Sequence, residues 1–238
     1  MRIALIGYGK MGKAIEEIAV ARGHEIGLKI QSSNLDQLTP ENLAFNDVAI
    51  EFTGPHSAAE NIRKCIDAGI PVVCGSTGWT SHLDEVRDLV KTRNGSFVYA
   101  SNFSVGVNIF FEVNKRLAEL IADRGDYEVI LEEIHHTQKK DAPSGTAITL
   151  AEQILQRVPR KKKWVNDLSD NPEDLEIISQ RIDPTPGTHS VRYSSAVDTI
   201  EITHTAHNRK GFALGAVLAA EFLPGKKGIF GMTEVLQF

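Results

Sequence analysis

The segment HHTQKKDAPSGTA, residues 135–147, combines two histidines and two lysines with a Pro-Ser-Gly-Thr turn. An imidazole has an unperturbed pKa of about 6.5, so His135 can exchange a proton at neutral pH, and Lys139 can supply positive charge or a proton nearby. A helix that begins at such a turn leaves backbone N–H groups unpaired, and these groups attract anions together with the helix dipole. The segment therefore predicts proton transfer beside a carboxylate site.

A strand must carry the histidines. YEVILEEIHH, residues 127–136, alternates in the way that a half-buried strand does. A period of two places Glu133 and His135 on one face of this strand and His136 on the other. Both histidines can face one pocket only if the strand ends there.

A helix is expected directly after Pro143. Ser144 can act as its N-cap, and an apolar stripe runs from Ala147 to Val158. The N–H groups at the helix start and the hydroxyls of Ser144 and Thr146 would then form an anion hole that a carboxylate fits. The alternative is a capped helix after a polar loop, with histidines that only form hydrogen bonds. The whole cluster, in a chain with a dinucleotide motif, favours catalysis.

A glycine-rich turn follows the first apolar run of the chain. Residues 2–6, RIALI, read as a strand, and a helical spacing of apolar residues begins at Met11. Gly7 permits the tight turn, Gly9 lets a pyrophosphate approach the backbone, and Gly12 lets the helix pack on its strand. The predicted dinucleotide-binding turn comprises Gly7, Tyr8, Gly9, Lys10, Met11 and Gly12.

The second predicted strand, residues 25–30, ends where a site selective for NADH usually carries a carboxylate. The residues there are Lys29, Gln31, Ser32 and Ser33, and none is acidic. Lys29 or the hydroxyls could accept a 2′-phosphate, although a lysine that is merely exposed is an equally good reading. We expect NADPH or NADH as the cofactor, with a preference for NADPH or for dual use.

Strands and helices alternate over the first hundred residues, which predicts a parallel sheet covered on both faces. The further strands are expected at residues 47–52, 70–74 and 96–101, and the further helices at residues 56–68 and 81–93. The pattern then changes to a long helix, a strand, two more strands and a helix, at residues 106–123, 127–136, 192–208 and 211–222. This order predicts a second, α+β domain, and residues 228–236 could return to the first sheet.

The composition excludes several classes of function. The net charge is -5, so there is no general attraction to nucleic acid or anionic lipid, and no window is apolar and long enough to span a bilayer. The basic run Arg160–Lys163 has no interleaved aromatic residues and is expected to be a solvated loop. Cys65 and Cys74 have no metal-ligand spacing and read as buried thiols, so a cytoplasmic location is the default.

The segment EEIHHTQKKDAPSGTA resembles the signature of the dihydrodipicolinate reductase family, the 4-hydroxy-tetrahydrodipicolinate reductases of the diaminopimelate route to lysine. Four further segments match the same family in order: EFTGPHS, CGSTGW, ASNFSVGVN and ITHTAHNRKGFALGA. The resemblance therefore covers essentially the whole chain. It implies a Rossmann-like dinucleotide-binding domain, residues 1–104 and 209–238, and an α+β domain, residues 105–208, that binds a cyclic dicarboxylate and assembles a homotetramer.

The resemblance also implies roles for individual residues. His135 would be the acid–base residue, and His136 and Lys139 would contact substrate, with Lys139 also a proton donor. At the start of the helix, Gly145 with Thr146 would hold a substrate carboxylate. The nicotinamide side of the pocket would be lined by Gly75, Ser76 and Thr77, and the cofactor pocket would be completed by Ala100, Ser101, Asn102 and Phe103.

The chain departs from the family pattern in three places. Thr188 stands where an acidic residue is expected, the loops between residues 160 and 190 are short, and the glycine turn is one residue tighter than in some relatives.

Two other functions fit the glycine motif: another NAD(P)-dependent dehydrogenase of an amino-acid precursor, and a dinucleotide-sensing regulator without catalysis. The first does not predict the His-His-x-x-Lys run, and the second expects a basic recognition surface. No metal site is expected, because no set of His, Asp and Glu residues has ligand spacing. His204 and His207 lie three residues apart, but on a strand they would face opposite sides.

Overall fold

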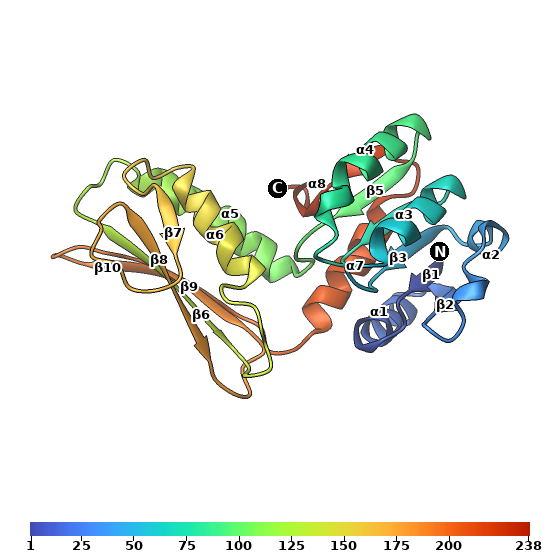
Figure 1. The fold of residues 1–238 in the computed structure, drawn as a ribbon, viewed down its shortest axis with the longest axis horizontal. Helices are drawn as coiled ribbons and strands as arrows, with labels where there is room; N and C mark the ends of the chain where they lie inside the picture. Colours follow the sequence, from blue (N-terminus) through green and yellow to red (C-terminus); the bar gives the residue numbers. More distant parts are fainter. The chain divides into compact units, whose positions relative to one another are not determined.

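The computed structural model describes residues 1–238, and the chain divides into two compact units (Figure 1). The first unit contains Met1–Val105 and Arg209–Phe238, and the second contains Gly106–Asn208. The boundaries expected from the sequence, after residues 104 and 208, coincide with these limits or lie one residue away. The chain therefore leaves the first unit once and returns to it.

The first unit is built on a six-stranded parallel sheet with the strand order β11-β5-β4-β3-β1-β2. Its strands are β1 (Arg2–Ile6), β2 (Glu25–Ile30), β3 (Val48–Glu51), β4 (Val72–Cys74), β5 (Ser96–Tyr99) and β11 (Gly228–Phe230). All strands point the same way, so their carboxyl ends lie at one edge of the sheet. The loops after β1, β3, β4 and β5 meet there, which is where open α/β sheets bind ligands.

Helices cover both faces of this sheet (Figure 1). They are α1 (Lys10–Ala21), α2 (Pro40–Ala44), α3 (Ala58–Asp67), α4 (Leu83–Thr92), α7 (Lys210–Phe222) and α8 (Met232–Leu236), with short 3₁₀ turns at Leu35–Gln37 and Thr80–His82. In β1, Ala4 and Ile6 pack with α2, α3 and α4, whereas Ile3 and Leu5 pack with α1, α7 and α8. Burial on both faces explains why the strands read as continuous apolar runs.

The C-terminal segment joins the first sheet, as the sequence suggested. β11 pairs in parallel with β5, and Gly228 lies opposite Ser96. α7 approaches the chain after β5 at Gly215, where a Cβ would lie 1.6 Å from the carbonyl oxygen of Phe103. Only a residue without a side chain allows this contact between two backbones.

The second unit is a five-stranded mixed sheet with the order β10-β9-β6-β8-β7. Its elements are α5 (Val105–Ile121), β6 (Glu128–His135), α6 (Gly145–Leu155), β7 (Lys163–Val165), β8 (Asp174–Arg181), β9 (Thr188–Ser194) and β10 (Thr199–Thr205). β6 is central, with β8 parallel to it and β9 antiparallel. Leu131 of β6, Ile177 of β8 and Val191 of β9 are fully buried against α5 and α6.

The structure corrects the interpretation of residues 160–181. We expected Arg160–Lys163 to be a solvated loop, and this is wrong for the side chains of Arg160 and Lys161 and for Lys163, which is exposed but begins β7. The Arg160 guanidinium donates to the carbonyl oxygens of Ala122 and Tyr127, and Lys161, only 5% exposed, pairs with Glu128 at 2.9 Å. The strands β7 and β8 were not predicted, although β8 lies beside β6.

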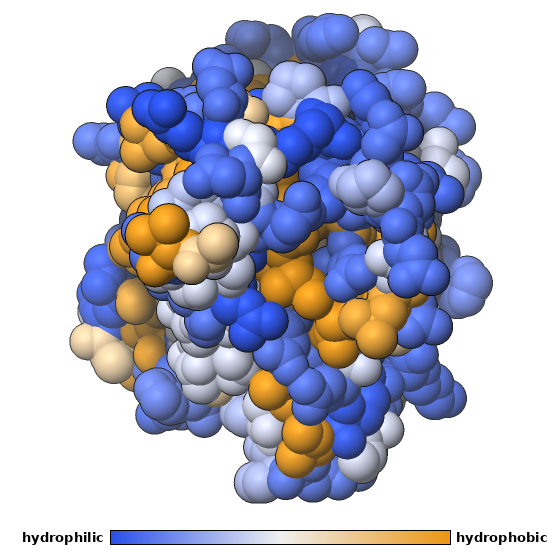
Figure 2. All heavy atoms as spheres, turned by 90° about the vertical axis from the view of Figure 1, so that its left-hand side faces the viewer, coloured by the Kyte–Doolittle hydropathy of each residue, from blue (hydrophilic) through white to orange (hydrophobic).

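The other face of the second sheet is not covered by α5 or α6. Ile130 and Ile178 are half-buried there and line, with Glu132, Ser190, Arg192 and Glu201, a hollow of about 230 Å³. Figure 2, which views the molecule from the left side of Figure 1, shows apolar patches among polar residues. No helix of the protein has the length and apolar character that crossing a membrane requires.

Replacing Gly215 with alanine should lower the stability of the first unit, even though alanine is favoured over glycine in helices by about 1 kcal/mol. The new methyl group would collide with the Phe103 carbonyl oxygen, and overpacking of this kind costs about 1 to 3 kcal/mol. Denaturant unfolding followed by circular dichroism measures the change. Gly211→Ala on the same helix is the control, because its Cβ would meet Ser104 Oγ at an ordinary 3.4 Å. Equal stability of the two variants would contradict the close approach.

Candidate active site

A buried carboxylate organises the end of β6. Glu133 is 0% exposed, and both of its oxygens accept the backbone N–H of Ser144 at 3.1 Å. Its Oε1 also accepts from Ser179 Oγ at 2.8 Å and from Arg181 Nη2 at 3.2 Å. Ser179 and Arg181 belong to β8, and Ser144 is the residue before α6, so one side chain connects three elements.

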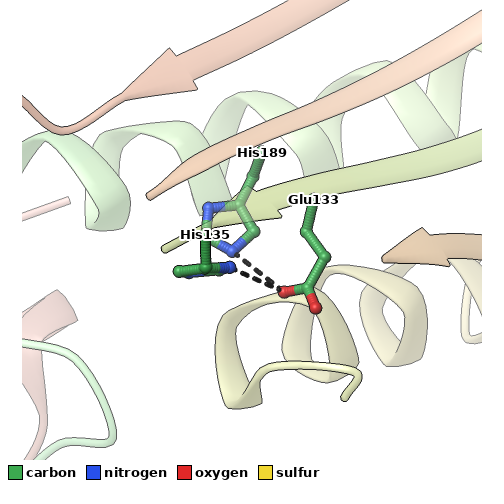
Figure 3. A group of neighbouring side chains, drawn as sticks. All are labelled: Glu133, His135 and His189. Carbon is green, nitrogen blue, oxygen red and sulfur yellow. Dashed lines mark ion pairs between the residues drawn. The ribbon is translucent and has the colours of Figure 1, made fainter. Parts of the chain in front are cut away.

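Two histidines face the same carboxylate (Figure 3). His135 Nδ1 lies 3.4 Å from Glu133 Oε2, and His189 Nε2 of β9 lies 3.7 Å from the same oxygen. The two rings meet edge to face with centroids 5.0 Å apart. His189 Nε2 is also 3.1 Å from Ser144 Oγ. The predicted acid–base residue therefore lies beside a second histidine that is distant from it in the chain.

Burial and charge shift the pKa values of all three groups. Burial alone would raise the pKa of Glu133, but the hydrogen bonds from Ser144, Ser179 and Arg181 and the charge of His135 hold it below its ordinary value. Burial lowers the pKa of His135, and Glu133 opposes that shift. Burial, reinforced by His135, lowers the pKa of His189 to about 3. His189 is consequently neutral at physiological pH.

The same three residues could be considered as metal ligands. One atom from each of Glu133, His135 and His189 lies within 4.8 Å of the others. However, the carboxylate oxygens already accept hydrogen bonds, one of them from the Arg181 guanidinium. The positive charge of that guanidinium would repel a metal ion. The geometry therefore favours a Glu133 carboxylate that is held by hydrogen bonds and binds no metal.

The start of α6 is capped as predicted. Ser144 Oγ accepts the backbone N–H of Ala147 at 3.2 Å, and Ser144 is only 3% exposed. The N–H and hydroxyl of Ser144 are thus used inside the protein. Gly145 is exposed and Thr146 is half-buried, so these two residues carry the accessible part of the helix start.

A loop connects the histidines with α6 and carries the predicted lysine. β6 ends at His135, so the following His136 is released from the strand. Lys139 is half-buried, and its Nζ contacts both carboxylate oxygens of Asp141 at 2.8 and 2.9 Å. Arg181 holds this loop, because its guanidinium donates hydrogen bonds to the carbonyl oxygens of Lys139 and Asp141. An anionic ligand would compete with Asp141 for Lys139.

The glycine turn of the first unit has the close contacts that its motif requires. Gly7 has a φ of +97°, and a Cβ on it would lie 2.2 Å from the carbonyl oxygen of Phe52. A Cβ on Gly12 would lie 2.6 Å from the Gly7 oxygen, whereas the space at Gly9, the N-cap of α1, is open. The N–H groups in the first turn of α1 have no intrahelical acceptor, so a pyrophosphate fits this turn.

Side chains beside the turn form a hollow of about 270 Å³ in the first unit. It is lined by Met11, Phe52, Gly75, Ser101, Asn102, Phe103, Arg209 and Phe212. Gly75 lies against the Phe52 ring, where a Cβ would come within 2.0 Å of a ring carbon. Of the other predicted cofactor residues, Ala100 is half-buried, Thr77 is exposed, and Ser76 is buried and accepts from Thr53 N.

Phe52, Arg209 and Phe212 were not among the predicted cofactor residues, although the segments EFTGPHS and ITHTAHNRKGFALGA contain them. Glu133, Arg181 and His189 were not predicted to belong to the site either. The alternation of β6 placed Glu133 on the same face as His135, so the sequence did contain a signal for Glu133. Arg181 and His189 carried no such signal, because pairing of β8 and β9 with β6 is what brings them there.

The loop after β3 depends on a second buried carboxylate. Glu51, which is 0% exposed, accepts from the backbone N–H of Thr53 at 3.0 Å and from Asn61 Nδ2 at 3.4 Å. The Cys74 thiol of β4 lies 3.2 Å from its other oxygen, and burial raises the pKa of this thiol. Both cysteines are buried free thiols, as predicted.

Comparison with known proteins gives consistent matches over the whole chain. The family models of the N-terminus and of the C-terminus of dihydrodipicolinate reductase match residues 1–103 and 106–236. The 4-hydroxy-tetrahydrodipicolinate reductase of Christiangramia forsetii is 50% identical over 240 residues, which cover 99% of this chain and 98% of the relative. The enzyme of the same name from Methanoregula boonei is 35% identical over 193 residues, which cover 80% and 74%.

Solved structures agree in fold. The dipicolinate-bound dihydrodipicolinate reductase from Paenisporosarcina sp. TG-14 superposes with a TM-score of 0.77 over 98% of each chain, at 22% identity. This likeness confirms the Rossmann-like first unit and the second mixed-sheet unit. The sequence matches, which extend over both units, identify the family. The chain belongs to the dihydrodipicolinate reductase family of lysine and diaminopimelate biosynthesis, and it is an oxidoreductase.

Proposed function

We propose that the chain reduces 4-hydroxy-tetrahydrodipicolinate, a cyclic dicarboxylate, to tetrahydrodipicolinate with NADPH or NADH. One observation carries this proposal beyond the family relationship. A buried histidine at the end of β6, a lysine in the next loop and the open start of α6 lie within one short segment of the second unit. Such a segment offers a proton and two sites for anions, which a dinucleotide-sensing regulator would not need.

In this proposal the residues of the second unit bind the substrate and protonate it. A reduced nicotinamide bound in the first unit would supply a hydride to the carbon–carbon double bond conjugated with the ring imine, once water has left the 4-hydroxy compound. His135 delivers a proton to the resulting enamine. Lys139 and His136 contact substrate, and Gly145 and Thr146 hold a carboxylate at the helix start. Ser144 keeps that helix start in place as its cap.

The glycine turn and the hollow beside it are the proposed cofactor site. The residues from Gly7 to Gly12 would cradle the pyrophosphate, Gly75 to Thr77 would line the nicotinamide side, and Ala100 to Phe103 would complete the pocket. The absence of side chains at Gly7 and Gly12, where each would collide with backbone, supports this assignment. Arg209 adds a positive charge to the lining of the hollow.

We infer that both nicotinamide cofactors are used. The residues after β2, Gln31 to Ser33, carry no carboxylate that would repel a 2′-phosphate. Lys29 is the nearby cation, but its Nζ is 2.7 Å from Glu16 Oε1 and 4.9 Å from the centroid of the Tyr8 ring. Its charge is therefore partly neutralised, which reduces any advantage of NADPH over NADH.

We further infer a homotetramer and a cytoplasmic location. The face of the second sheet left open by α5 and α6 combines isoleucines with Glu132, Arg192 and Glu201, a mixture of apolar and oppositely charged groups that suits contact between copies of one chain. Light scattering on the purified protein measures the mass of the assembly. Free thiols at Cys65 and Cys74 support a reducing compartment, which cell fractionation tests.

The function is tested by following absorbance at 340 nm with NADPH and with NADH. The substrate is generated enzymatically from pyruvate and aspartate semialdehyde. We expect oxidation of both cofactors that depends on the substrate. If the folded protein binds dinucleotide but oxidises neither cofactor, the proposed cofactor site is retained and the proposed substrate is refuted.

The variant His135→Gln should lower kcat by about 10² to 10⁴, the usual contribution of a general acid, with a much smaller effect on substrate affinity. Steady-state kinetics at saturating NADPH separate the two parameters. Thermal unfolding of the variant serves as the check that it is folded. A normal kcat in a folded variant would refute the role of His135.

The variant Lys139→Ala should raise the KM for the dicarboxylate by about 10- to 100-fold, because a hydrogen bond to a charged group contributes about 1.5 to 3 kcal/mol. Lys140→Ala is the matched control, since Lys140 is the adjacent residue and is exposed. The same KM in both variants would show that Lys139 does not bind the substrate.

A further inference from the structure

We propose that Glu133 is a positioning residue: its carboxylate orients the ring of His135 and keeps a proton on Nδ1, so that Nε2 carries the proton that is transferred. This inference rests on the proposed function, in which His135 is the proton donor. It gives a role in the reaction to a residue that is completely buried and that touches no substrate.

The carboxylate is held firmly enough to orient a neighbour. It accepts hydrogen bonds from Ser144 N, Ser179 Oγ and Arg181 Nη2, which come from the start of α6 and from β8. Burial would otherwise favour its protonated form, and these donors keep it ionised. A fixed anion therefore lies beside His135 at neutral pH.

The two nitrogens of the His135 ring have different surroundings. Nδ1 is buried without a well-aligned hydrogen-bond partner, and Glu133 Oε2 lies 3.4 Å from it. Bonds of this kind are often long before a substrate binds and shorten in the complex. Nε2 lies beside Gly187, where a Cβ would be 3.1 Å away. A side chain at residue 187 would therefore crowd that nitrogen.

This asymmetry determines the tautomer. The hydrogen bond made by one imidazole nitrogen sets which nitrogen carries the proton in the neutral ring. A carboxylate beside Nδ1 favours the Nδ1–H form, so the proton lost from a protonated ring is the one on Nε2. Without the carboxylate, Nδ1 has no acceptor, and the neutral ring can hold its proton on Nε2 instead.

Charges from each neighbouring element of the second unit act on His135. Glu133 of β6 and Asp141 of the loop favour its protonated form, and Lys139 of the loop and Arg181 of β8 oppose it. His189 of β9 lies against its ring, and α6 presents the uncharged Ser144. Removing the charge of Glu133 should therefore lower the pKa of His135 further.

Nuclear magnetic resonance of protein labelled with ¹⁵N-histidine tests the inference without any turnover. His135→Gln identifies the His135 signals. In the unaltered protein the neutral ring should carry its proton on Nδ1, and in Glu133→Gln the proton should move to Nε2 and the pKa should fall. An Nε2–H tautomer in the unaltered protein would overturn the inference, even if Glu133→Gln failed to fold.

Kinetics distinguish positioning from a purely structural role. In Glu133→Gln the amide oxygen can still accept from Ser144 N, so KM should change by less than about threefold. The value of kcat should fall by at least about tenfold, up to the loss of about 10² to 10⁴ expected for His135→Gln. Because the acid must be protonated, kcat/KM is lost as pH rises through the pKa of His135, and this loss should occur at lower pH in the variant.

The control is Glu152→Gln, which makes the same chemical change at an exposed position of α6 and should leave kcat, KM and the pH profile unchanged. An unchanged pH profile in a folded, active Glu133→Gln protein would refute the role of Glu133 and leave the proposed function unaffected. If the unaltered protein oxidises neither NADPH nor NADH, the proposed function fails, while the resonance measurement still decides whether Glu133 sets the tautomer.

Discussion

The negative charge buried at Glu133 is the constraint on which the second unit depends. A carboxylate removed from water is costly unless hydrogen bonds and an opposite charge compensate it. Ser179 and Arg181 supply part of that compensation, and Ser144 N supplies the rest. The pairing of β8 with β6 and the position where α6 begins are thereby linked to one side chain.

The first unit uses a similar arrangement for a different purpose. Glu51 ends β3 as a buried carboxylate, and its hydrogen bonds to Thr53 and Asn61 hold the loop that follows. That loop passes close to Gly7, whose missing side chain accommodates the Phe52 carbonyl. In both units, polar groups satisfied inside the protein fix a loop at the carboxyl end of a strand, and the exposed part of that loop remains available for ligands.

Local patterns predicted much of this architecture. The run RIALI, the turn GYGKMG and the helical spacing after it correspond to β1, the glycine turn and α1, because period and turn chemistry act over a few residues. The alternation of β6 likewise placed Glu133 with His135. The prediction failed for Arg160 and Lys161, because whether a basic side chain is solvated depends on carbonyl and carboxylate groups that lie far away in the chain.

The family, the two kinds of domain, the cap at Ser144 and the candidate proton donor could be predicted before the fold was known, since motifs and periodicity express them directly. Only the tertiary structure brought Arg181 and His189 to Glu133, because strand order and register cannot be read from a single strand. The same holds for Arg209 and Phe212, which reach the hollow beside the glycine turn when the C-terminal segment returns to the first sheet. The surroundings that shift the pKa of a residue are contacts between segments that are distant in the chain, and these contacts exist only once the chain has folded.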